Sequence, residues 1–162
     1  MILNKTKTST HAVTSLPELI DETLGQFYPS LFVSLNELTT ALNLLTKESG
    51  DHELLSMVQK IFSELDTMYR KEKFVVFPYI KKCYTENKKM ETCAPIKNLK
   101  LHVSTILGLL QIIKQLLPDP NKQSHYEGLV NNFESKLISL QKEKEKYIFE
   151  PVRSCVGCKV VH

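Results

Sequence analysis

Four cysteines carry the chemistry that is easiest to name in this sequence: Cys83, Cys93, Cys155 and Cys158. The last two form a Cys-Val-Gly-Cys pair. Four thiolates can hold zinc in tetrahedral geometry, with His162 able to replace one of them. The C-x-x-C pair can instead form a redox-active disulfide. The sequence favours a third interpretation, free thiols in a loose C-terminal segment without metal, because chain ends are usually poorly ordered.

Two charged residues, Glu72 and Lys144, stand where the helical pattern calls for a buried apolar residue. An unpaired buried charge costs several kcal/mol, so each needs a partner or a route to water. We expect the two side chains to pair across the interior, with the Tyr28 hydroxyl joining them in a core polar cluster. The alternative is that both extend outward to solvent at the end of the molecule.

Four long segments with helical periodicity must position these residues. They span about 15–47, 51–84, 95–117 and 119–149, and the links between them are short. Ser15 with Glu18 forms a capping-box pattern, and Pro29 predicts a kink in the first segment. The pattern predicts an all-α, up-down-up-down four-helix bundle over 15–151, with a flexible N-terminal segment, 1–14, and a C-terminal tail, 152–162. We see no strand alternation and no obvious internal repeat.

Apolar residues spaced alternately by three and four predict which face of each helix is buried. The first stripe begins with Leu24 and Tyr28. The second continues after Glu72 as Val75 and Tyr79, and the fourth continues after Lys144 as Tyr147.

The composition excludes several classes of protein. The chain has 162 residues, 42% of them hydrophobic and 24% charged, with a net charge of +3. This charge is too small and too evenly mixed to predict nucleic-acid binding. No apolar run approaches the roughly 18 residues that cross a membrane, and no signal peptide is recognised, so we expect a cytoplasmic protein. Phosphate loops, Ser/His/Asp sets and paired catalytic carboxylates are not found, so no enzyme activity is expected.

Residues 64–80 resemble the second helix of hemerythrin-like proteins, most closely the di-iron proteins that repair iron–sulfur clusters (repair-of-iron-centres proteins). The matching residues there are Lys71-Glu72, Phe77-Pro78 and Tyr79-Ile80. The other helices are similar to the family at Leu19-Ile20-Asp21, at Pro95-Ile96 and Gly108, and at Phe133-Glu134, Leu137, Leu140, Lys144, Tyr147-Ile148-Phe149 and Pro151. The resemblance implies the hemerythrin-like fold over about 15–151.

The resemblance also implies which positions would carry the iron ligands. Only Glu72 keeps a ligand type, and His102 lies a half-turn from the third-helix position at Ser104. The remaining ligand positions fall on Tyr28 (or Phe27), Met68, Leu140 and Lys144. A cation at 144 stands where cations would bind, so we expect no di-iron centre and no cofactor. Glu72 with His102 is retained as an alternative residual metal site for zinc or iron.

Three functional hypotheses follow. The leading one is a degenerate hemerythrin-like domain, a non-enzymatic binding or regulatory module without a di-iron centre. Its partner would be an unidentified protein or small ligand, and it would be a monomer or a homodimer. The second is a zinc- or iron-binding or redox protein that uses the cysteine cluster or the Glu72/His102 site. The third is an enzyme or an iron–sulfur repair factor of the parent family.

Overall fold

The computed structural model describes residues 14–50, 52–117 and 120–153, and for 120–124 it describes the backbone only. The described residues form four helical rods and no strand. The first rod consists of α1 (Leu16–Glu22), η1 (Thr23–Phe27) and α2 (Tyr28–Ser49), and the second of α3 (Glu53–Lys71), η2 (Glu72–Val76) and α4 (Phe77–Thr85). The third is α5 (Ala94–Leu116), and the fourth consists of α6 (Pro120–Lys144), η3 (Glu145–Phe149) and η4 (Glu150–Val152).

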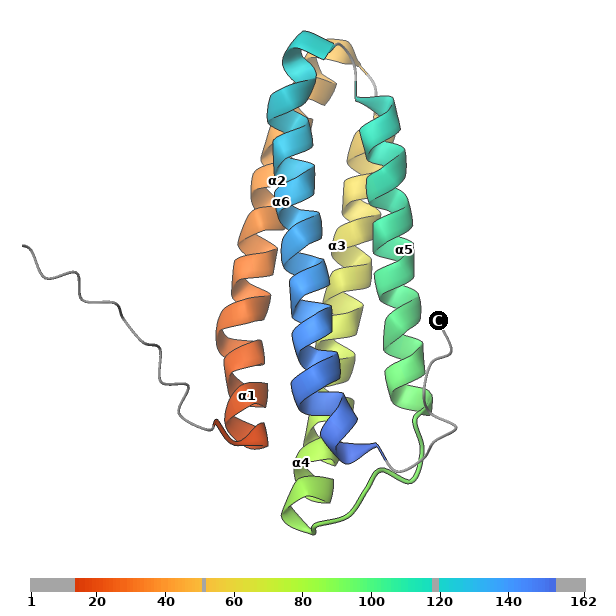
Figure 1. Ribbon diagram of the computed structural model, residues 1–162. Helices are drawn as coiled ribbons and strands as arrows, with labels where there is room; N and C mark the ends of the chain where they lie inside the picture. Colours follow the sequence, from red (N-terminus) through yellow and green to blue (C-terminus); the bar gives the residue numbers. More distant parts are fainter. Residues whose placement is uncertain (1–13, 51, 118–119, 154–162) are drawn as a thin grey trace, which may run out of the picture.

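Rods that follow one another along the chain run in opposite directions (Figure 1). The helix α2 packs against α3 and α6, and α5 packs against the same two helices. The helices α3 and α6 therefore stand at opposite corners of the bundle. These observations confirm the all-α, four-helix prediction.

The ends of the rods follow from local sequence. The Ser15 N–H donates a hydrogen bond of 2.8 Å to the Glu18 carboxylate, which completes the predicted capping box before α1. This contact with the Ser15 backbone lowers the pKa of Glu18 below its ordinary value. At the other end of the first rod, Gly50 has φ of 72° and its N–H donates to the Thr46 carbonyl. Glycine adopts this left-handed conformation without a Cβ clash, so it ends the helix.

Three of the four rods contain one π-helical turn, η1, η2 and η3, and a proline follows each turn at the same spacing. The residue before each proline donates its N–H to the carbonyl five positions earlier, in the pairs Tyr28 to Thr23, Phe77 to Glu72 and Glu150 to Glu145. A proline inside an α-helix clashes with the carbonyl four residues before it and lacks an N–H. The wider turn relieves that clash, so Pro29 is accommodated by η1 where the sequence predicts a kink.

Each π turn contains one more residue than an α-helical turn. The buried positions on one side of the turn are therefore shifted by one residue from those that a continuous α-helix would bury. The predicted burial of Val75 and Tyr147 is wrong, because these side chains are 59% and 47% exposed. Their neighbours Val76 and Ile148 are buried instead, at 2% exposed each. Before η1, the buried residues of the first rod are Leu16, Ile20 and Thr23, whereas Leu24 is half-buried. The stripe prediction therefore fails at Val75 and Tyr147 because a π turn changes the helical phase, whereas Val103, Tyr126 and Leu129, which lie away from the π turns, are half-buried rather than buried.

Candidate functional site

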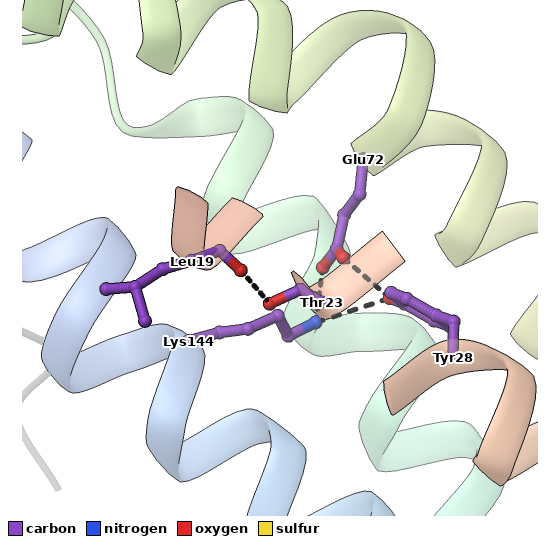
Figure 2. A network of polar contacts seen from close by, with 5 residues as sticks. All are labelled: Leu19, Thr23, Tyr28, Glu72 and Lys144. Atoms are coloured by element: carbon purple, nitrogen blue, oxygen red, sulfur yellow. Dashed lines mark hydrogen bonds and ion pairs between the residues drawn. The ribbon is translucent and has the colours of Figure 1, made fainter. Parts of the chain in front are cut away.

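The core of the bundle contains a cluster of three polar residues from three rods, Tyr28, Glu72 and Lys144 (Figure 2). The Tyr28 hydroxyl donates a hydrogen bond of 2.6 Å to Oε2 of Glu72. The Lys144 ammonium donates to Oε1 of Glu72 and, at 3.4 Å, to the Tyr28 hydroxyl oxygen. The structure thus brings together the three residues of the expected core polar cluster, and each of them lies in or next to a π turn.

All three side chains are removed from solvent. Tyr28 and Glu72 are 0% exposed and Lys144 is 1% exposed. Burial raises the pKa of Tyr28 well above its ordinary value of 10.0, and the adjacent Glu72 carboxylate raises it further. Burial lowers the pKa of Lys144 below its ordinary value of 10.5, and the Glu72 carboxylate partly offsets this effect. The cluster therefore combines a neutral phenol with an ion pair that has no net charge.

The local surroundings satisfy most of the polar atoms in the cluster. Both Glu72 oxygens accept a hydrogen bond, and the Lys144 ammonium lies 5.5 Å from the Tyr28 ring centroid and 6.0 Å from that of Phe149. Thr23 projects into the same region, but its hydroxyl donates to the Leu19 carbonyl at 2.8 Å (Figure 2). Such buried networks strengthen electrostatic interactions because the local dielectric constant is low.

A short internal repeat accounts for the opposite charges of Glu72 and Lys144 in the core cluster. Residues 71–78, KEKFVVFP, resemble 144–151, KEKYIFEP, which corrects the expectation that no repeat is present. The π turns and prolines repeat with an offset of 73 residues. The buried positions repeat with an offset of 72, because Met68, Glu72 and Val76 correspond in burial to Leu140, Lys144 and Ile148. One copy therefore buries its glutamate, and the other buries the preceding lysine.

His102 does not join Glu72. Its Nδ1 lies 2.6 Å from a Glu64 carboxylate oxygen, and its Nε2 lies 2.8 Å from the Lys71 amine. A neutral ring that donates from Nδ1 to Glu64 and accepts at Nε2 fits both contacts. The sequence reasoning missed these two partners of His102. Ser104, the position that the resemblance assigns to a third-helix ligand, is exposed.

The cysteines form the second candidate site. Cys83 is a buried free thiol, 5% exposed, on α4. Cys93 is buried at the start of α5 and is disulfide-bonded, so its sulfur is not a thiolate ligand in this state. Cys155, Cys158 and His162 lie outside the described residues, so the four-cysteine site stays a prediction.

The residues present do not fit a di-iron centre. Two iron ions need several carboxylates and imidazoles from four helices. The core supplies one carboxylate, Glu72, and both of its oxygens are already engaged by Tyr28 and Lys144. Within 14–50, 52–117 and 120–153, no group of three or more His, Cys, Asp and Glu side chains is placed to hold a metal ion.

No helix in the described part of the chain has the length and apolar character needed to cross a membrane. No family model matches the sequence, and neither the curated proteins nor the solved structures include one that matches the chain.

Proposed function

We propose that this protein is a non-enzymatic binding or regulatory module of hemerythrin-like descent, in which an organic ion pair takes the place of a di-iron centre. The observation that carries the proposal is the buried contact between the Lys144 ammonium and the Glu72 carboxylate. The ammonium supplies the positive charge that metal ions would otherwise bring to the Glu72 carboxylate.

The protonation and burial of the cluster support a structural role rather than catalysis. A general acid or base works best with a pKa near the operating pH and needs access to a substrate proton. Tyr28 has a pKa raised well above 10.0 and stays protonated, and neither charged partner is exposed to solvent. The cluster holds three rods together, which leaves the outer faces of the bundle to bind a partner.

Metal analysis of the purified protein tests this proposal directly. Protein prepared without chelator should contain less than one iron or zinc per chain, and EDTA should not change its unfolding midpoint. Two irons per chain with a bridged di-iron absorption band would overturn the proposal.

A restored ligand set tests the hemerythrin-like descent separately. The combined substitutions Tyr28→His, Met68→His, Leu140→His and Lys144→Glu place ligands on buried positions of three rods. We expect this variant to fold in the presence of ferrous iron and to bind it, whereas the same variant with Glu72→Gln should bind much less. A folded variant with no iron affinity would count against this ancestry.

A thiol redox protein is the second candidate, because Cys93 is disulfide-bonded. Alkylation and mass analysis of native protein, before and after reduction, would test it. This candidate predicts that a glutathione redox buffer converts the Cys93 disulfide reversibly to thiols. A purely structural disulfide would resist such a buffer.

A further inference from the structure

A groove lies between α5 and the last rod, at the point where α6 continues into η3. Its volume is about 920 Å³. Its apolar floor consists of Ile96, Leu99, Val103 and Leu107 from α5 and Phe149 from η3. The four α5 residues share one face of the helix, and at ~1.5 Å per residue they extend for about 16 Å. The floor is therefore long, and the volume of the groove lies within the range of small-molecule sites.

The rim of this groove is positively charged. Lys100, Lys142, Lys146 and Arg153 line it, against two carboxylates, Glu145 and Glu150. Glu145 is already engaged: one oxygen lies 2.5 Å from Arg153 Nη1 and the other 3.7 Å from Lys100 Nζ. Lys142 and Lys146 are exposed, and the described residues offer neither of them an ion pair. The rim thus has an excess of cations that a bound anion would neutralise.

Two buried polar atoms in the groove lining have no hydrogen-bond partner among the described residues. They are Nε of Arg153 and Nε2 of Gln141. The Arg153 side chain is only 13% exposed, so water has little access to it. A buried donor without an acceptor is unfavourable, because its hydrogen bonds to water are lost and not replaced. The Arg153 Nε–H can only donate, so the group that would satisfy it must be an acceptor.

We propose that the groove binds a fatty acid of medium chain length. Its carboxylate accepts hydrogen bonds from Arg153 Nε and Gln141 Nε2, and its alkyl chain lies along the α5 floor. This proposal names a ligand class for the binding role and rests on that proposed function. A fatty acid fits better than a protein segment because the lining offers two unpaired donors, enough for one small head group, beside an apolar floor.

Titration calorimetry with dodecanoate, kept below its micelle-forming concentration, tests the proposal on the full-length protein. We expect saturable binding of one molecule per chain. Acetate shares the head group without the tail, and dodecyltrimethylammonium shares the tail with the opposite charge. Both should bind at least about tenfold more weakly, a factor that corresponds to about 1.4 kcal/mol. Equal binding of the cationic probe, or no saturable binding of dodecanoate, would overturn the proposal.

Matched variants locate the site. Val103→Glu places a carboxylate on the half-buried floor and should abolish binding, whereas Ile112→Glu, at a position on α5 that is 41% exposed and outside the lining, should leave it unchanged. Gln141→Leu removes one donor and should weaken binding about tenfold or more. Circular dichroism shows whether each variant is folded. Unaltered binding by folded Val103→Glu and Gln141→Leu proteins would place the ligand elsewhere and overturn the proposal.

The chain's own C-terminal segment is the alternative occupant, because residues 154–162 follow Arg153 directly. Val156→Ser, Val160→Ser and Val161→Ser together remove the valine side chains of that segment within the full-length protein. If dodecanoate binds only to this variant, the segment is the natural occupant and the fatty-acid proposal is wrong.

The binding measurements do not depend on metal content. Iron in the wild-type protein would therefore overturn the proposed function without changing the binding curve for dodecanoate.

Discussion

The Lys144 ammonium donates a hydrogen bond to the Glu72 carboxylate although their rods, which contain α6 and α3, stand at opposite corners of the bundle. The pair therefore spans the diagonal of the core, and Tyr28 from the first rod joins it. A buried ion pair adds little net stability, because desolvation of both charges opposes their attraction. We expect it to act mainly on specificity, since only one alignment of the rods brings the two charges together.

Removal of Lys144 should destabilise the protein strongly. Lys144→Ala leaves the Glu72 carboxylate buried without its cation, and the free energy of unfolding should fall by about 3–5 kcal/mol. Lys146→Ala, at an exposed position two residues away, should change it by less than about 0.5 kcal/mol. Urea unfolding at neutral pH measures both values. A loss below about 1 kcal/mol for Lys144→Ala would mean that the ion pair behaves as a surface pair.

Replacement of both charges should restore most of that stability. Glu72→Leu with Lys144→Met fills similar volume with apolar groups, and such exchanges of buried ion pairs are often neutral or stabilising. The double variant should therefore unfold near the wild-type midpoint, while Lys144→Met alone should not. If the double variant is as unstable as the single one, the destabilisation comes from lost packing around residue 144 rather than from an unpaired charge.

Tyr28 should lose its proton later than the other tyrosines as the pH rises, because burial and the Glu72 carboxylate raise its pKa above 10.0. A group with a raised native pKa stabilises the folded state below the unfolded value, and this contribution falls as pH rises above it. The lowered pKa of Lys144 has the opposite effect, so its contribution to stability rises with pH up to about 10.5, the ordinary pKa of this group. Above that pH the Tyr28 contribution should dominate, and the wild-type protein should lose stability.

Tyr28→Phe isolates this contribution. At neutral pH the variant should be about 1–3 kcal/mol less stable, because Glu72 Oε2 loses its donor. The difference from wild type should shrink as pH rises above 10.0. Ultraviolet titration of the six tyrosines should show one late ionisation in the wild-type protein that is missing from the variant. A wild-type titration without a late step would show that the Tyr28 hydroxyl is open to solvent.

Two glycines should respond to alanine in opposite directions. Gly50 has φ of 72°, which strains any residue with a Cβ, so Gly50→Ala should destabilise by about 1 kcal/mol. Gly108 lies inside α5 with nothing within 4 Å of an added Cβ, so Gly108→Ala should stabilise by about 0.5–1 kcal/mol. Thermal unfolding of the two variants provides the comparison, and equal changes would contradict the assigned helix end.

The sequence predicts the rods well because their apolar spacing and their proline and glycine boundaries are local signals. It also points to Glu72 and Lys144, since a charge on an apolar stripe is visible without coordinates. It fails at Val75 and Tyr147 because a helical count assumes α-geometry, and one inserted residue rotates the remainder of the helix. The repeat of KEKFVVFP and KEKYIFEP is the signal that could have revealed both π turns, because equal spacing to a proline occurs in each.

The partners of His102 could not be predicted in the same way. Glu64 and Lys71 lie on α3, and the face of α3 that meets α5 depends on how these two helices pack. The groove could not be predicted from the sequence either. Val103 follows the spacing of the buried residues of α5, but it is half-buried and lines the groove. Local patterns assign a face to a helix, whereas the distance between two neighbouring helices depends on all the side chains packed between them.

Deletion variants should distinguish a π turn from an ordinary helical turn. Val75 is an exposed residue of η2, and its deletion restores α-helical spacing between Glu72 and the buried Val76 and Ile80. Pro78 would then clash with a carbonyl at a cost of about 3 kcal/mol, so the deletion is combined with Pro78→Ala. Deletion of Lys60, an exposed residue of α3, rotates one part of the rod by about 100° relative to the other. We expect the Val75 deletion to retain cooperative thermal unfolding and the Lys60 deletion to lose it. Equal damage from the two deletions would mean that η2 is needed for more than the accommodation of Pro78.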